Sequence, residues 1–298
     1  MTTIAVIGMG DMGSGLAARL VEKGARVVTT LDGRSARSGE RAAAAGVEVR
    51  EGDAALAAAE IVLSVVPPAV APAVAGRMRP HLMAASAAPV FVDCNAIAPS
   101  TVKDMAEPYA AAGLTFVDAS IIGGPPRPGD VGPRLYMSGP AAAAAATLAT
   151  HGLDARLVSE AIGDASALKM SYAGITKGFQ ALASAMALGA FRNGVGGALI
   201  EELRFSQGET YARLCRQLPG MYAKAYRWDG EMREIAKFLE PEAGSVAMLS
   251  GAADLFERIA KAFASGADSE IMEILNGFVS TEPATPGGDN VVRINRRT

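Results

Sequence analysis

The feature that most constrains the fold is a glycine-rich segment near the start of the chain, TIAVIGMGDMGSGLAARLVEKG, at residues 3–24. Gly8, Gly10 and Gly13 have Gly-x-Gly-x-x-Gly spacing, directly after an apolar run typical of a strand and at the start of a helical pattern. In that context the first glycine makes a tight turn, the second lets a pyrophosphate approach the backbone, and the third lets helix and strand pack closely. Free N–H groups at the helix start attract the phosphates. The segment therefore predicts a dinucleotide site formed by Gly8, Met9, Gly10, Asp11, Met12 and Gly13.

The first part of the chain alternates β-rich runs with alanine-rich helical stretches. Strands are predicted at residues 3–8, 25–31, 47–49, 61–66, 90–93, 115–119, 134–138 and 156–158. Continuous apolar strands separated by helices indicate βαβ units and a buried parallel sheet. The right-handed crossover rule then favours a doubly wound α/β domain of the Rossmann type.

Strand signals stop after about residue 163, and the rest of the chain reads as helical. One long helix is predicted over residues 164–193, ending at RNGVGG, where asparagine and glycine favour a helix stop. Further helices are predicted over 197–217, 220–239, 243–264 and 268–279. The predicted organisation is a dinucleotide-binding domain (1–163), an interdomain helix (164–193), an all-α substrate or dimerisation domain (194–280) and a tail (281–298) expected to be disordered.

A buried stripe is predicted in the helix over 220–239. Its apolar residues recur at the spacing of one helix face, which favours protein core or a subunit interface over a cofactor site: Ala225, Trp228, Met232, Ile235 and Leu239.

Composition narrows the class of protein. The 298 residues suit two domains, and a net charge of -3 gives no reason to expect nucleic acid or an anionic membrane. Two cysteines, Cys94 and Cys215, do not form a disulfide framework and fit a reducing cytoplasm. No signal peptide or membrane span is predicted, and neither His81 nor His151 has a metal-ligand pattern. We expect a soluble cytoplasmic protein without a metal site.

The choice of cofactor depends on TTLDGRS, residues 29–35. Asp32 lies at the distance from the glycines where an acid would bind the ribose 2′-hydroxyl of NAD. Arg34 and Ser35 would instead hold the 2′-phosphate of NADP, by charge and by hydroxyl donation. The two interpretations compete, and the fit of a guanidinium to phosphate favours NADP(H) over NAD(H).

Several segments together resemble the β-hydroxyacid dehydrogenases and 6-phosphogluconate dehydrogenase. The glycine loop is similar to theirs, and GRS at 33–35 stands where many NADP-dependent members have Asn-Arg-Thr. VDCNAIAPST (92–101) matches at Asn95 and Pro99, and DASIIGGPPRPGDVGPRLYMSG (118–139) matches a substrate-binding segment at Gly123 and Gly124. IGDASALKMSYAG (162–174) resembles the catalytic segment, with Lys169 on the catalytic lysine.

The resemblance implies hydride transfer between a nicotinamide and a small hydroxy or carbonyl compound. Lys169 would give or take the proton at the substrate oxygen, and Asn95 would lie beside the nicotinamide and help to orient the substrate. Val66 and Pro67, at the end of the fourth predicted strand, are expected to line the cofactor as well. Members of the family typically form homodimers whose helical domains complete one another's active sites.

The departures from the family concern the substrate. Ile122 replaces a serine before the paired glycines, Ala173 replaces an asparagine four residues after the lysine, and Thr176 replaces a glutamate of the phosphogluconate dehydrogenases. Arg127, in a longer proline-rich loop, is a candidate to replace the serine as partner of a carboxylate. The predicted substrate-binding residues are Ser120, Ile122, Gly123, Gly124, Arg127, Tyr172, Ala173 and Thr176.

Helical spacing places Tyr172, Ala173, Thr176 and Gln180 on the same face as Lys169, whereas Lys177 lies off that face and is expected to be solvated. A lysine between Leu168 and Met170 is also compatible with a side chain that only extends its ammonium to water. Two alternatives to the dehydrogenase stay open. An imine reductase would suit an apolar pocket, although that group often replaces the lysine, and a non-catalytic nucleotide sensor would need neither Lys169 nor Asn95.

Overall fold

A computed structural model describes residues 1–86, 88–127, 129–266 and 269–280. The chain separates into two compact units, a first unit formed by Met1–Tyr172 and a second unit that begins at Ala173. The predicted tail over 281–298 lies outside the described residues.

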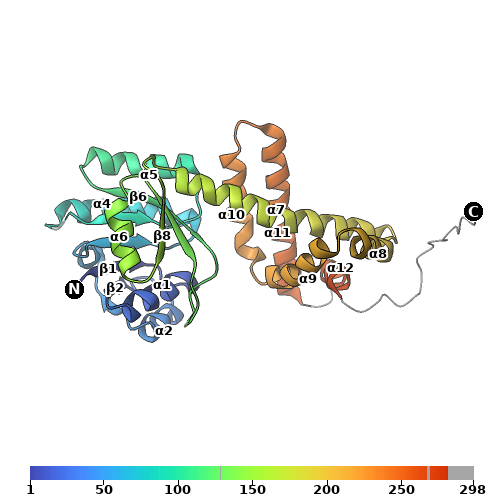
Figure 1. Cartoon of the computed structure of the whole chain (residues 1–298), viewed down its shortest axis with the longest axis horizontal. Coiled ribbons are helices and arrows are strands. Elements are labelled where there is room, and N and C mark those ends of the chain that lie inside the picture. The colour runs from blue at the N-terminus through green and yellow to red at the C-terminus, as the bar shows by residue number, and fades with distance from the viewer. Residues whose placement is uncertain (87, 128, 267–268, 281–298) are drawn as a thin grey trace, which may run out of the picture. The chain divides into compact units, whose positions relative to one another are not determined.

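Within the described residues, the first unit contains one eight-stranded sheet with the strand order β3-β2-β1-β4-β5-β6-β7-β8 (Figure 1). Strands β6 and β7 pair antiparallel, and every other pair of adjacent strands in this sheet is parallel. This sheet confirms the predicted Rossmann-type α/β class and all eight predicted strands. Their bounds are β1 (Thr3–Ile7), β2 (Arg26–Thr30), β3 (Glu48–Arg50), β4 (Ile61–Ser64), β5 (Val90–Asp93), β6 (Phe116–Ile122), β7 (Arg134–Ser138) and β8 (Asp154–Ser159).

Helices cover both faces of the sheet because successive strand residues point to opposite sides. Ile4 and Val6 of β1 belong to one apolar cluster, and Ala5 and Ile7 belong to the other. Residues of α1 (Asp11–Glu22), α2 (Ala36–Ala44) and α6 (Ala142–Thr150) join the first cluster. Residues of α3 (Asp53–Leu56), α4 (Ala71–Ala84) and α5 (Pro99–Ala111) join the second, and a short 3-10 helix, η1 (Pro68–Val70), precedes α4.

The second unit is helical. Its elements are the rest of α7 (Asp164–Arg192), α8 (Gly196–Ser206), α9 (Gly208–Tyr222), α10 (Ala225–Phe238), α11 (Ala243–Ser265) and α12 (Glu270–Val279). None of the helices in the described part of the chain has the length and apolar character needed to cross a membrane.

Two predicted helix boundaries in this unit are wrong. The predicted helix over 197–217 is divided between α8 and α9 at Gln207, and the break predicted around residue 219 is absent because α9 runs on to Tyr222. A proline inside a helix removes one backbone hydrogen bond and costs about 3 kcal/mol. Pro219 itself is exposed, but its neighbours along α9, Leu218, Met221 and Tyr222, are buried, and this apolar burial favours the unbroken helix.

The apolar stripe of α10 is confirmed as core. Ala225, Trp228, Met232 and Ile235 are buried, and the Trp228 ring meets Phe256 of α11 edge-on with centroids 5.3 Å apart. Leu239, beyond the end of α10, is only half-buried.

The prediction that Lys177 is solvated is wrong. Its side chain is 15 % exposed, forms an ion pair with Glu231 and lies 4.9 Å from the centre of the Trp228 ring. The carboxylate and the ring both attract the ammonium, so the charge turns toward α10 rather than toward water.

Candidate active site

The glycine loop brings β1, β4 and α1 closer together than side chains would permit. Gly8 has a φ of 101°, and a Cβ there would lie 2.2 Å from the Val65 carbonyl oxygen. A Cβ on Gly13 would lie 1.9 Å from the Gly8 carbonyl oxygen, whereas a Cβ on Gly10 would meet nothing within 4 Å. The turn is therefore tightly packed against the protein at Gly8 and Gly13, whereas Gly10, next to the N-terminus of α1, faces open space. This arrangement fits a pyrophosphate on the helix N–H groups.

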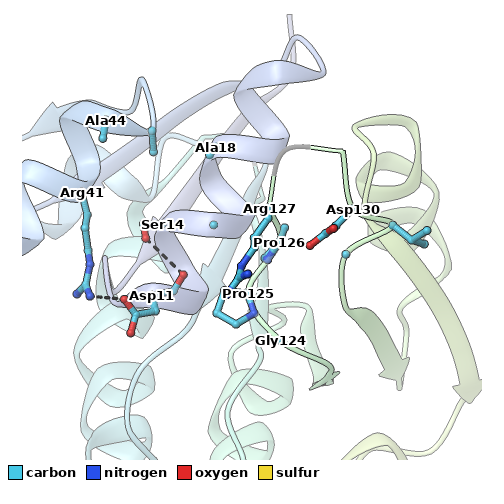
Figure 2. Close-up of a pocket in the computed structure, with 14 residues that line it drawn as sticks. Asp11, Ser14, Ala18, Arg41, Ala44, Gly124, Pro125, Pro126, Arg127 and Asp130 are labelled. Carbon is cyan, nitrogen blue, oxygen red and sulfur yellow. Dashed lines mark hydrogen bonds and ion pairs between the residues drawn. The ribbon is translucent and has the colours of Figure 1, made fainter. Parts of the chain in front are cut away.

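Asp11 places a carboxylate at this phosphate-binding end of α1, and an arginine from the next helix compensates for it. The Arg41 guanidinium of α2 forms an ion pair with Asp11, as Figure 2 shows, and Ser14 Oγ donates to the Gly10 carbonyl oxygen at 2.7 Å. Arg41 is a site residue that sequence reasoning missed, because nothing in a local pattern links residues thirty positions apart.

The residues that are predicted to choose the cofactor lie together beyond the carboxyl end of β2. Asp32 Oδ2 accepts from the Gly52 N–H at 3.2 Å, and the Arg34 N–H donates to the Leu31 carbonyl oxygen at 3.0 Å. Ser35 occupies the N-cap position of α2, and its Oγ lies 3.3 Å from Ser38 Oγ. Asp32, Arg34 and Ser35 are all exposed. Because β1 and β2 are parallel, these side chains share the sheet edge with the glycine loop.

Asn95 connects the ends of β4 and β5. Its Oδ1 accepts from the Val66 N–H at 2.7 Å, and its Nδ2 donates to Ser64 Oγ at 3.1 Å and to Asp93 Oδ1 at 2.6 Å. Both amide hydrogens therefore bind protein groups, and the oxygen holds the backbone that leads into Pro67. In this structure Asn95 shapes the edge of the sheet, while its contact with a substrate stays a prediction.

Asp93 is a fully buried carboxyl group beside Asn95. Burial raises the pKa of Asp93 from 3.8 to about 7, the hydrogen bonds from Asn95 partly oppose the shift, and the charge of Asp118 adds to it. Asp118 is the register partner of Asp93 on the neighbouring strand, β6. The two carboxyl groups thus lie side by side on adjacent strands, and because both are buried their repulsion is stronger than it would be at the surface.

Lys169 meets the carboxyl end of β6. Its half-buried side chain donates from Nζ to the Ile121 carbonyl oxygen at 2.9 Å. Ile122 ends the strand, and Gly123 follows with a φ of 135°, where a Cβ would lie 2.9 Å from the Pro133 Cα. Ser120 Oγ is buried and has no hydrogen-bond partner among the described residues. The structure therefore places Lys169 on the backbone of β6 at Ile121, and Ser120, Ile122 and Gly123 adjoin that residue along the chain.

The loop after Gly124 folds back on α1. Arg19 Nη2 donates to the carbonyl oxygens of Arg127 at 3.3 Å and Asp130 at 2.8 Å, and a Cβ on Gly15 would lie 2.9 Å from Pro126 Cδ. A cleft of about 790 Å³ lies between this loop, α1 and α2, and Arg127 and Arg41 both line it (Figure 2). Arg127 is therefore grouped with the N-terminus of α1, and Lys169 does not line this cleft. The role of Arg127 as partner of a substrate carboxylate stays a prediction.

The remaining predicted substrate residues continue along α7. Tyr172 is the last residue of the first unit and is half-exposed. Ala173 is buried in the second unit, Thr176 Oγ1 donates to its carbonyl oxygen at 3.4 Å, and Gln180 Nε2 donates to the Thr176 carbonyl oxygen at 3.1 Å. Thr176 and Gln180 thus both donate to carbonyl oxygens of their own helix.

Metal and thiol chemistry find no support in the described part of the chain. No group of three or more His, Cys, Asp or Glu side chains there is placed to hold a metal ion. Cys94 is buried among apolar residues of the first unit, and burial raises the pKa of its thiol, which favours the neutral form.

A family model described as the NAD binding domain of 6-phosphogluconate dehydrogenase matches residues 3–151, half of the chain. The chain belongs to this dehydrogenase family. A second family model, described only as a domain of unknown function, matches residues 190–259. The glycine loop lies within this NAD-binding domain, and the predicted class of NAD(P)-dependent dehydrogenases and reductases is confirmed at the level of the family.

Two proteins are similar to this chain at 30% identity or more, one curated enzyme and one solved structure. A 3-hydroxyisobutyrate dehydrogenase from Pseudomonas aeruginosa is 35% identical over 130 residues, which span 42% of either protein. The solved structure of a conserved protein of unknown function, described as structurally similar to 3-hydroxyacid dehydrogenases, is 30% identical with a TM-score of 0.66, covering 89% of this chain and 99% of that one.

Two more distant structures share the fold. A Mycobacterium tuberculosis 3-hydroxyisobutyrate dehydrogenase with L-serine is 19% identical, with a TM-score of 0.65 and coverage of 93% and 99%. A Myxococcus stipitatus imine reductase with NADP+ is 19% identical, with a TM-score of 0.51 and coverage of 93% and 100%.

The raised pKa of Asp93 predicts a pH-dependent stability. Between pH 3.8 and about 7 the folded state binds more protons than the unfolded state, so this contribution is complete at low pH and is lost as the pH rises through 7. Relative to Asp93→Asn, the wild type should lose at least about 1 kcal/mol of unfolding free energy between pH 5 and pH 8, the equivalent of one pKa unit. Urea unfolding across that range measures the difference.

The matched control is Asp104→Asn, which removes an exposed carboxylate from α5. It should keep the wild-type dependence on pH. Parallel curves for the wild type and Asp93→Asn would contradict the assignment.

Proposed function

We propose that this chain is an NADP(H)-dependent oxidoreductase that transfers a hydride between the nicotinamide and a small hydroxy or carbonyl compound. The observation that carries the proposal is the position of Lys169. Its Nζ reaches the Ile121 carbonyl oxygen at the carboxyl end of β6, and β1, β4, β5 and β6 run parallel. The lysine therefore shares a sheet edge with the glycine loop and with Asn95, where ligands of doubly wound sheets bind.

The residues at this edge have separate roles in binding the cofactor. The N–H groups at the start of α1 bind the pyrophosphate, and Arg41 offsets the Asp11 carboxylate there. Asn95 fixes the Val66 backbone beside the nicotinamide position. When bound, the nicotinamide supplies or accepts the hydride.

Lys169 transfers the proton to or from the substrate oxygen. In reduction, its Nζ donates a proton to the substrate oxygen while the carbonyl carbon receives the hydride, and the lysine is left neutral. In oxidation the neutral amine takes the hydroxyl proton as the hydride leaves. The hydrogen bond from Nζ to the Ile121 carbonyl oxygen keeps the lysine head group at this edge of the sheet.

The apolar residues of the site support a second candidate. Ile122 and Ala173 replace polar groups that would hold a hydroxyacid, so a substrate with an apolar body, including an imine, is the alternative. Retention of Lys169 supports the hydroxy or carbonyl substrate. We also propose the cytoplasm as the compartment, since both cysteines are free.

We further propose a homodimer formed along α7. Ile175, Phe179, Leu182 and Met186 follow one another at alternating intervals of four and three, the spacing of helices that pack side by side. Ile175, Leu182 and Met186 are 74%, 59% and 57% exposed. The apolar stripe around Trp228 is already buried within the second unit, so we propose the exposed face of α7 as the interface.

Lys169→Ala should reduce kcat at least about a hundredfold, the usual scale for the loss of a general acid, and should leave NADPH binding near normal. Steady-state kinetics and a fluorescence titration of NADPH measure the two effects. Lys23→Ala, which removes an exposed lysine from the end of α1, is the control and should keep wild-type turnover. Full activity of Lys169→Ala would remove the lysine from the mechanism, and failure to bind either nucleotide would end the enzyme proposal.

Arg34→Ala should weaken NADPH binding by at least about tenfold, since a charge-assisted phosphate contact is lost, and should change NADH binding by less than about twofold. Asp32→Asn is the reciprocal variant and should mainly affect NADH. Isothermal titration with both nucleotides decides the question, because equal losses for both in Arg34→Ala would assign selectivity to Asp32 and NAD.

The dimer is tested by size-exclusion chromatography with light scattering. The wild type should have the mass of two chains at micromolar concentration, and Leu182→Glu should shift it to one, because a charge would be buried at the seam. Leu157→Glu, on the exposed edge strand β8, is the matched control and should stay dimeric. A monomeric wild type would refute the proposal.

A further inference from the structure

Asp118 is a fully buried carboxylate in β6 to which the proposed function gives no role. Its Oδ2 accepts three hydrogen bonds, from Ser138 Oγ at 2.9 Å and from the Gly163 and Ser166 N–H groups at 3.0 Å each. Its Oδ1 accepts from Ser166 Oγ at 2.7 Å. One side chain therefore accepts four hydrogen bonds from three residues.

Three of these four donors belong to the beginning of α7. The first N–H groups of a helix have no partner within it, and a negative charge is favourable at that end. Asp118 takes the N–H groups of Gly163 and Ser166, and Ser138 Oγ takes the N–H of Ala165 at 3.0 Å. The sheet therefore caps α7 with a carboxylate and a hydroxyl that come from two different strands.

The same strand holds α7 a second time, at the proposed catalytic residue. Lys169 lies one turn after Ser166, and its Nζ binds the carbonyl oxygen of Ile121, three residues beyond Asp118 in β6. A shift of the helix by one residue would rotate Lys169 by about 100°. The first turn of α7 cannot make such a shift while the N–H groups of Gly163 and Ser166 both donate to Asp118.

We propose that Asp118 is a positioning residue for Lys169: by capping the first turn of α7 it fixes the rotation and height of the helix that carries the lysine. This inference rests on the proposed function of Lys169. Ser166 and Ser138 assist, because each joins the same carboxylate to the helix.

Asp118→Asn tests the role with little change in shape. The amide oxygen can stay where Oδ2 receives its three donors, and the amide nitrogen can donate to Ser166 Oγ, so the loss is mainly that of the charge. We expect kcat to fall by roughly ten- to a hundredfold, the scale of an ångström-sized misplacement of a reacting group. NADPH affinity should stay within about twofold, because the glycine loop is untouched.

A double-mutant cycle distinguishes a role of Asp118 that acts through Lys169 from a purely structural role. If Asp118 acts through Lys169, Asp118→Asn should cost less than about twofold in kcat once Lys169→Ala is present, since residues that act as a unit are not additive. Tyr109→Phe is the control: it removes another buried hydrogen bond of the first unit, to the Ala75 carbonyl oxygen at 2.7 Å, away from α7. It should lower stability and leave kcat unchanged.

The outcomes distinguish the two proposals. Full activity of Lys169→Ala refutes the proposed function itself. A slow Lys169→Ala together with an unaffected Asp118→Asn, or an equal loss from Asp118→Asn in both backgrounds, refutes only the positioning role. Should Asp118→Asn fail to fold, Ser166→Ala decides through the same cycle: it removes one hydroxyl contact and should cost roughly three- to tenfold in kcat, again only when Lys169 is present.

Discussion

The first unit depends on the contact between helix α1 and the turn that precedes it. Gly13 lies against the Gly8 carbonyl oxygen, and Gly8 lies against Val65, so neither position has room for a Cβ. This contact fixes the start of α1 against the ends of β1 and β4 and leaves the helix N–H groups facing the open space at Gly10. Asn95 extends the same edge to β5 through the Val66 N–H. A site for an extended dinucleotide follows from backbone packing before any side chain binds it.

The sequence predicted the sheet well because its strands are buried on both faces. Apolar runs such as Ile61–Ser64 and Val90–Asp93 have few other stable environments, and alanine-rich helices fill the spaces between them. Helix boundaries in the second unit were less predictable. Pro219 suggests a break, yet burial of its neighbours keeps α9 intact, and Lys177 suggests a solvated charge until Glu231 and Trp228 provide it with partners. In each case a tertiary contact outweighs the local preference.

The same limit applies to the site. The glycine loop, Asn95 and Lys169 are visible in sequence because each stands in a recognisable motif. Arg41 and Asp118 are not, because their partners lie 20 to 48 residues away along the chain. The loop that carries Arg127 shows the converse case. Its composition suggests a substrate contact, and only the structure reveals that Arg19 of α1 holds its backbone. Sequence motifs therefore point to candidate site residues, whereas contacts between distant segments emerge only from the fold.

The two buried carboxyl groups at the edge of the sheet illustrate why that second set matters. Asp93 and Asp118 are neighbours in register, and two charges so close in a dry interior would repel strongly. Their partners differ. Asp118 has four donors and faces the positive end of α7, whereas Asp93 has two donors, both from Asn95, and its pKa is raised to about 7. The hydrogen-bond donors, rather than the register of the two strands, thus make Asp118 the cap of α7 and leave Asp93 to Asn95.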